Sequence, residues 1–131
     1  MSKKQNENGE LTQALEMYVK TIYELEEEYG SAAASDIAEK LEVKAPSVTS
    51  ALQKLDALGM AEYHRYQHVN LTEKGRKVAV KLDRRHRTLR DFLILIGVNE
   101  QIAFSDACEI EHIVHKETID KLAQFLKKYG K

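Results

Sequence analysis

Hydrophobic positions recur with a helical period along most of the chain. From Leu11 to Tyr29 the apolar residues form one stripe and the segment ends near Gly30, so it is predicted to be a helix. A short helix follows from Ser35 to Leu41, with Ser35 as its expected N-cap. A third helix is predicted from Pro46 to Leu58. Its inward residues are Val48, Leu52, Leu55 and Leu58, and Gly59 closes it.

After Gly59 the period changes. Residues 60–64 and 69–71 form two short extended segments joined by residues 65–68, which predicts a β-hairpin. Thr72 is then expected to cap a long helix from Glu73 to about Ile96, ended by Gly97, and helices near residues 100–112 and 116–129 follow. The predicted fold is mainly α: a winged helix-turn-helix domain over residues 1–72, with residues 1–9 as a mobile tail, and a helical domain over residues 73–131.

Composition narrows the class of protein. A chain of 131 residues has the length of one domain or of two small ones. It contains no apolar run long enough to span a membrane and no signal-peptide core, so we expect a cytoplasmic protein without a membrane partner. The single cysteine, Cys108, cannot form an internal disulfide and suits a reducing compartment, where its thiol is free to bind a metal.

Charge is unevenly distributed along the chain. The net charge is −1, yet residues 40–90 hold 12 Lys and Arg against 5 Asp and Glu, whereas residues 1–39 hold 3 against 9. A positive middle third between acidic ends is expected if one surface meets the phosphates of DNA. Without a supporting motif, the same distribution would be a chance fluctuation of surface charge.

The segment from Ser35 to Gly59 has helix-turn-helix proportions, and its second helix would read double-stranded DNA. Short hydroxyl and amide side chains project from that helix and suit base edges, while Lys54 can reach phosphate. The hairpin tip forms a polar wing. The alternative is an ordinary solvated helix face. The candidate DNA-binding residues are Lys44, Pro46, Ser47, Thr49, Ser50, Gln53, Lys54, Arg65, Tyr66 and Gln67.

Cys108, Glu111 and His112 are spaced i, i+3 and i+4, so on one helix their side chains would share about a third of the circumference. A thiolate, a carboxylate and an imidazole together can bind a borderline divalent metal. The alternative is a helix flank with a half-buried cysteine. Met17 stands on an otherwise polar face of the first helix, where its thioether is either a packing contact or a soft metal ligand.

Taken together, the motifs resemble the diphtheria-toxin-repressor family of iron- and manganese-dependent transcriptional regulators. The resemblance spans about residues 15 to 126. It rests on the stretches 16–27, 35–41, 45–49, 71–76, 84–87 and 107–112 in the order of the family. It implies a homodimeric repressor that binds palindromic operators when metal is bound, and that controls metal-homeostasis genes. The implied metal ligands are Met17, Cys108, Glu111 and His112.

Departures from the family pattern affect the choice of metal. In the manganese branch the positions of Met17, Lys20 and Cys108 are typically aspartate, glutamate and glutamate. Sulfur ligands suit manganese poorly, so iron(II) is the first choice and manganese(II) the second. The iron-type members hold a second metal at the position of His86 with a glutamate and a histidine, but here Arg90 and Phe104 occupy those places. The second metal site is therefore expected to be absent or to be formed by other groups. His86 is expected either to lie near the remaining metal site or to be a packing residue.

Two further expectations follow from the resemblance and the apolar pattern. The chain ends at Lys131, so the SH3-like domain of longer members is expected to be absent. The helical half carries more apolar side chains than its short segments can bury alone, which predicts dimerisation through that half. They are Phe92, Leu93, Leu95, Ile96, Phe104, Ile110, Ile113 and Val114.

Three other function classes are possible. One of them, a winged helix used only for protein contacts, would leave the basic middle third of the chain unexplained. A winged-helix repressor that responds to an organic ligand would have the same DNA-reading element, but it would need an apolar pocket and no metal. An enzyme has little support, because no orienting group or phosphate loop accompanies Cys108 and His112.

Overall fold

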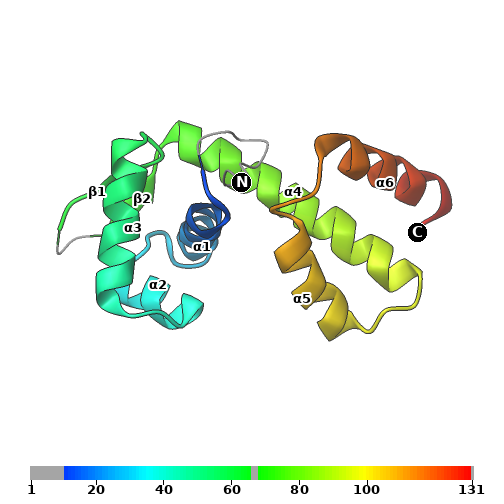
Figure 1. Cartoon of the computed structure of the whole chain (residues 1–131), viewed down its shortest axis with the longest axis horizontal. Coiled ribbons are helices and arrows are strands. Elements are labelled where there is room, and N and C mark those ends of the chain that lie inside the picture. Colours follow the sequence, from blue (N-terminus) through cyan, green and yellow to red (C-terminus); the bar gives the residue numbers. More distant parts are fainter. Residues whose placement is uncertain (1–10, 66–67, 131) are drawn as a thin grey trace, which may run out of the picture. The chain divides into compact units, whose positions relative to one another are not determined.

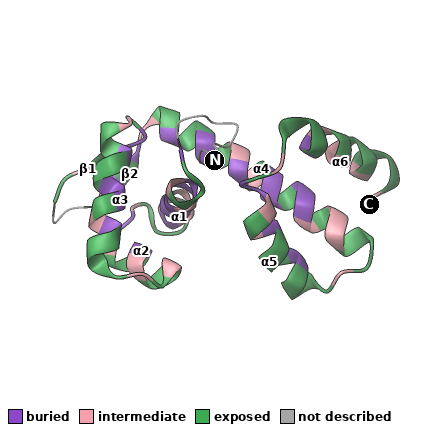
Figure 2. Ribbon diagram, viewed as in Figure 1, coloured by how far each residue is buried: buried purple, intermediate pink, exposed green. Residues whose placement is uncertain are grey.

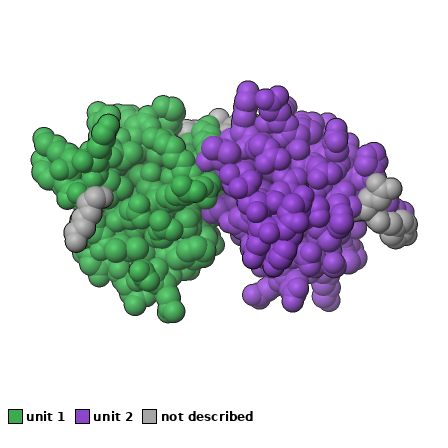
Figure 3. All heavy atoms as spheres, turned by 180° about the vertical axis from the view of Figure 1, so that it is seen from behind, with its two compact units in different colours: residues 1–9, 81–131 green, residues 10–80 purple. Residues whose placement is uncertain are grey.

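A computed structural model of the chain describes residues 11–65 and 68–130. The expected mobile tail, residues 1–9, lies outside these residues. The chain divides into two compact units, residues 10–80 and residues 81–131, which are described separately below (Figure 3). The division falls inside one helix, α4, eight residues beyond the domain boundary placed after residue 72 by the sequence pattern. That boundary stays a prediction.

The first unit is a winged helix-turn-helix, as the sequence predicted (Figure 1). Three helices precede a two-stranded antiparallel hairpin, and α4 begins directly after it. The elements are α1 (Gln13–Tyr29), α2 (Ala34–Leu41), α3 (Ala45–Ala57), β1 (Ala61–Tyr63), β2 (Val69–Leu71) and the first residues of α4 (Glu73–Leu95).

Helix α1 is set by its two caps and one apolar face. The hydroxyl of Thr12 accepts a hydrogen bond from the amide of Leu15 at 3.2 Å, and Gly30 ends the helix with φ of 84°. Val19, Ile22 and Leu25 are buried, as the apolar stripe predicted. Tyr29, assigned to the same stripe, is 68% exposed because it lies in the last turn, beyond the packed part of the helix.

The helix-turn-helix starts differently from the prediction at α2. Ser35 is not the N-cap: the helix begins at Ala34, and Ala33 takes the cap position without a side-chain hydrogen bond. Ser35 is therefore inside the first turn. Pro46 lies in the first turn of α3, where its missing N–H removes no helical hydrogen bond. One face of α3 is buried and the rest is exposed (Figure 2); the buried residues are Val48, Ala51, Leu52 and Leu55.

The hairpin is fixed to the helices by side chains from α1 and α3. Its register pairs Ala61 with Leu71 and Tyr63 with Val69. The carboxylate of Glu26 on α1 accepts from the amide of Leu71 at 3.0 Å and from Arg76 at 3.0 Å. One carboxylate thus holds both the second strand and the start of α4.

The second unit contains the rest of α4, α5 (Glu100–Ile110) and α6 (Lys116–Tyr129). Leu89, Ala107 and Ile119 form its buried centre, one residue from each helix, with Ile110, Val114 and Leu122 packed around them. Asn99 caps α5 by accepting from the amides of Gln101 and Ile102. No helix in the described part of the chain is long and apolar enough to cross a membrane.

Gly75 is the point of closest packing between α4 and the hairpin. A Cβ atom at this position would overlap the carbonyl oxygen of Met60 and lie 3.2 Å from the side chain of Leu71. The same carbonyl accepts a hydrogen bond from the amide of Thr72 at 3.0 Å, so it cannot move freely. Only glycine lets α4 start this close to the wing.

We therefore expect Gly75→Ala to destabilise the protein by about 1–3 kcal/mol, because the steric overlap exceeds the gain in helix propensity. Urea unfolding followed by circular dichroism measures the change. Lys77→Ala, at an exposed position of the same helix, is the matched control and should change stability little. A Gly75→Ala protein more stable than the parent would contradict the packing argument.

Candidate metal centre and DNA-binding face

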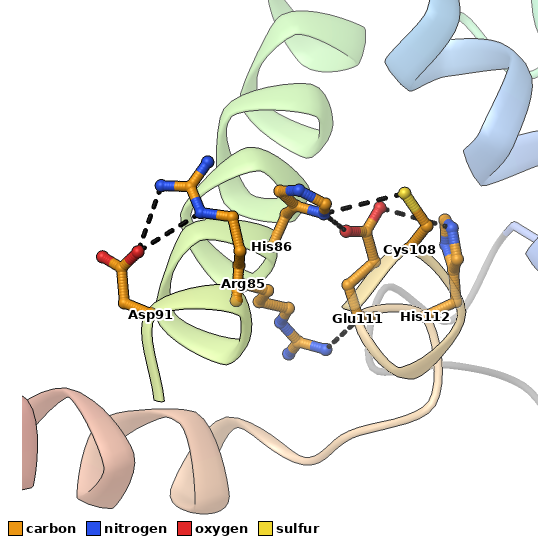
Figure 4. A network of polar contacts seen from close by, with 7 residues as sticks. Arg85, His86, Asp91, Cys108, Glu111 and His112 are labelled. Carbon is orange, nitrogen blue, oxygen red and sulfur yellow. Dashed lines mark hydrogen bonds and ion pairs between the residues drawn. The ribbon is translucent and has the colours of Figure 1, made fainter. Parts of the chain in front are cut away.

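Four potential metal ligands lie together in the second unit. Nδ1 of His86, on α4, lies 3.0 Å from a carboxylate oxygen of Glu111 and 3.8 Å from the sulfur of Cys108 on α5. Nε2 of His112 lies 3.4 Å from the other carboxylate oxygen of Glu111. Figure 4 shows the carboxylate of Glu111 between the two imidazoles. His86, Glu111 and His112 are buried, and Cys108 is half-buried.

The convergence arises differently from the sequence prediction. Glu111 and His112 were expected on one helix with Cys108, but α5 ends at Ile110. Glu111 and His112 instead lie in the turn that leads to α6. Their side chains still face Cys108 because Glu111 keeps a helical backbone conformation, with φ of −57° and ψ of −25°.

These groups suit a divalent metal by their chemistry. Two imidazoles, a carboxylate and a thiol are ligands for borderline first-row ions. Nε2 of His86 is buried and has no hydrogen-bond partner among residues 11–65 and 68–130, which is costly for a polar atom unless something binds it. In the described part of the chain, no three Cys, His, Asp or Glu side chains are arranged to hold a metal ion, and Glu111 contacts both histidines directly. A metal would replace these contacts.

Two of the three positions expected to hold a second metal, Arg90 and Phe104, contain no metal ligand. Arg90 donates to the carboxylate of Asp91 at 3.1 and 3.2 Å. Phe104 places its ring edge-on against the imidazole of His86, with 4.8 Å between the ring centres. A cation and a phenyl ring thus flank His86 at these positions.

Met17 lies on α1, in the first compact unit, and is half-buried. Its assignment as a ligand rests on the resemblance alone and stays a prediction.

The sequence analysis missed Arg85. This side chain, 4% exposed, donates to the carbonyl oxygens of Glu111 at 3.3 Å and Val114 at 2.7 Å. Its place in the basic run of residues 84–87 gave no sign of burial. The only available signal was its position directly before His86 on the same helix.

The first unit presents the expected DNA-reading residues on the outer side of α3. Opposite the buried face, Lys44, Pro46, Ser47, Ser50, Gln53 and Lys54 are exposed, and Thr49 is half-buried. Thr49 and Arg65 line one hollow with Tyr63, His68 and the first residues of α2 and α3. Recognition helix and wing therefore share a surface. Tyr66 and Gln67, also predicted to bind DNA, lie outside the described residues.

Comparison with known proteins identifies the family. Residues 10–69 match the model described as "Iron dependent repressor, N-terminal DNA binding domain", and residues 72–131 match "Iron dependent repressor, metal binding and dimerisation domain". The chain belongs to the iron-dependent repressor family. This is the diphtheria-toxin-repressor family that the motifs resemble, and its members are metal-dependent transcriptional regulators rather than enzymes.

Individual relatives agree with the family. The chain is 42% identical over 115 residues to the HTH-type transcriptional regulator MntR of Shouchella clausii (strain KSM-K16), covering 88% of this chain and 80% of that protein. It resembles the solved manganese regulator SloR with a TM-score of 0.77 and 31% identity, over 89% of this chain and 55% of SloR. A manganese-dependent repressor solved with manganese gives a TM-score of 0.80 at 26% identity, over 86% of this chain and 52% of that chain. The present chain thus spans about half the length of these solved regulators.

The family settles the choice between function classes. The iron-dependent repressors bind DNA through the part matched by the first unit, and they bind metal and dimerise through the part matched by residues 72–131. An enzyme is excluded, and nothing favours the repressor that senses an organic ligand.

Proposed function

We propose that this iron-dependent repressor holds its activating metal at Cys108, Glu111, His112 and His86, and that the metal-bound homodimer binds palindromic operators of metal-homeostasis genes in the cytoplasm. The observation that supports the centre most is the approach of His86 both to the carboxylate of Glu111 and to the sulfur of Cys108. Met17 is proposed as a further ligand from the resemblance. We also propose the domain boundary after residue 72.

When bound, the metal would be a Lewis acid that several side chains share. Glu111 and Cys108 would neutralise its charge, and His112 and His86 would offer neutral nitrogen ligands. The burial of Glu111 and His112 keeps competing water away from these groups.

We propose iron(II) as the first choice of metal and manganese(II) as the second. Relatives and solved structures named for manganese favour the latter. The chemistry of this chain favours iron, because a thiol at Cys108 is a softer ligand than the oxygen groups that manganese prefers. Arg90 and Phe104 beside His86 support one ion per chain at this centre.

The experiment that tests the centre measures operator affinity against free iron(II) and manganese(II) under anaerobic conditions. Cys108→Ala and His112→Ala should lose the response to metal, since each removes a ligand, while the proteins stay folded and dimeric. Glu109→Ala, an exposed neighbour on α5, is the control and should respond as the parent does. If Cys108→Ala and His112→Ala also respond like the parent, the centre lies elsewhere.

The same titration discriminates between the two metals. In the parent, iron(II) should activate at lower free concentration than manganese(II). Cys108→Glu should move the preference toward manganese, because it replaces sulfur with oxygen. Met17→Ala tests the fifth ligand: a parent-like response would remove Met17 from the centre.

For DNA, we propose that Lys54 and Arg65 contact phosphate, whereas Ser47, Thr49 and Ser50 contact bases. Lys54→Ala or Arg65→Ala should weaken binding to all DNA sequences. Each lost phosphate contact should also reduce the slope of log affinity against log salt concentration by up to about one unit. The control is Lys40→Ala, which removes the same charge from an exposed position on α2 that pairs with Glu24. Unchanged affinity and salt dependence in both variants would place the DNA on another face.

For the dimer, we propose a contact surface on α4 and α5 of the second unit. Of the residues predicted for it, Leu95, Ile96, Phe104 and Ile113 are 43–65% exposed, whereas Ile110 and Val114 pack onto the core. Exposed apolar groups of this size favour association.

The double variant Leu95→Glu/Ile96→Glu should therefore sediment as a monomer at micromolar concentration, because it places charges in an apolar contact. Tyr129→Ser, which changes an exposed aromatic residue on α6, should leave the dimer intact. A double variant that remains dimeric would exclude this surface.

A further inference from the structure

Arg85 differs from the other arginines around it. Arg84 and Arg87 are exposed and form ion pairs with Asp120 and Asp83. Arg85 is 4% exposed, and it donates hydrogen bonds to the main-chain carbonyl groups of Glu111 and Val114. Burying a guanidinium costs free energy unless it is hydrogen-bonded, so this side chain needs these carbonyls.

The two carbonyl groups bracket the segment that carries the proposed ligands. Glu111 is the C-cap residue of α5, directly after its last helical residue, and Val114 lies two residues before α6 begins at Lys116. Carbonyls at the end of a helix lack partners within it. By donating to Glu111 and Val114, one guanidinium fastens both ends of the short turn that contains His112 to α4.

We propose that Arg85 is a positioning residue of the metal centre. It fixes the main chain of the ligand turn, while its neighbour His86 contacts the carboxylate of Glu111. Two side chains of α4 thus hold the turn. Arg85 contacts the main chain of the turn, and His86 contacts the side chain of Glu111 (Figure 4). This inference rests on the proposed metal centre at Cys108, Glu111 and His112.

The direction in which metal affinity changes when Arg85 is removed distinguishes a positioning role from an effect of its positive charge. A guanidinium is a cation and does not attract a metal ion. If charge were its main effect, removing it would leave metal affinity unchanged or raise it. If Arg85 positions the turn, removing it lowers metal affinity, because the ligands must be ordered when the metal binds.

The test compares Arg85→Gln, Arg85→Lys and the control Arg87→Gln, which removes an exposed cation two residues away. The probe is cobalt(II), and the readouts are its dissociation constant by calorimetry and its visible spectrum, which reports ligand geometry. Arg85→Gln should raise the dissociation constant about 10- to 100-fold and shift the spectrum. Arg85→Lys should lie between Arg85→Gln and the parent, and Arg87→Gln should match the parent.

Thermal unfolding and sedimentation establish that each variant is folded and dimeric. A folded Arg85→Gln protein with parent-like cobalt affinity and spectrum would overturn the proposal. If that variant does not fold, a parent-like Arg85→Lys protein would overturn it, and loss of folding in both would assign Arg85 to stability alone. Cys108→Ala is included as well: if it leaves cobalt binding unchanged, the proposed centre itself fails, whatever Arg85 does.

Discussion

The attachment of the turn after α5 to helix α4 is the interaction on which the candidate metal centre depends. The buried core of the second unit is small and centred on Leu89, Ala107 and Ile119, and the turn contributes Val114 to the residues packed around it. Apolar packing alone would leave Glu111 and His112 weakly ordered. The hydrogen bonds from Arg85 and the contact between His86 and Glu111 fix the conformation of the turn, which the apolar core does not fix by itself.

A comparable constraint shapes the DNA-binding unit. The wing is a hairpin of two three-residue strands, too short to be stable by itself. Its position relative to α3 is set by Glu26, which bonds both β2 and α4, and by Asp56, whose carboxylate accepts from the amide of Tyr63 at 2.9 Å. The close approach at Gly75 completes the attachment. The surface formed by Thr49 and Arg65 depends on these few polar contacts.

The sequence predicted the order and type of the elements, because helical periodicity and turn residues are local signals. Thr72, for instance, accepts from the amide of Gly75 as its cap position required. The predicted end of α5, near residue 112, was wrong by two residues. The i, i+3, i+4 spacing of ligands is the same inside a helix as across its last residue, so it does not show where the helix ends. Burial of Arg85 could not be predicted, since it depends on carbonyl groups 26 and 29 residues away. Ser35 was predicted as the N-cap of α2 because serine is a good capping residue. The helix starts one residue earlier, at Ala34, so Ser35 does not occupy the cap position.

If the proposed metal centre is correct, the mutual contacts among His86, Glu111 and His112 would also set a threshold for signalling. An ion that enters the centre competes with interactions that already satisfy these groups, so their strength is subtracted from its binding free energy. Each 1.4 kcal/mol or so of stability in the self-paired arrangement raises the free metal concentration needed for half-occupancy about tenfold. Evolution could therefore retune the sensor to a richer or poorer environment by strengthening or weakening one hydrogen bond to Glu111, without exchanging a single ligand.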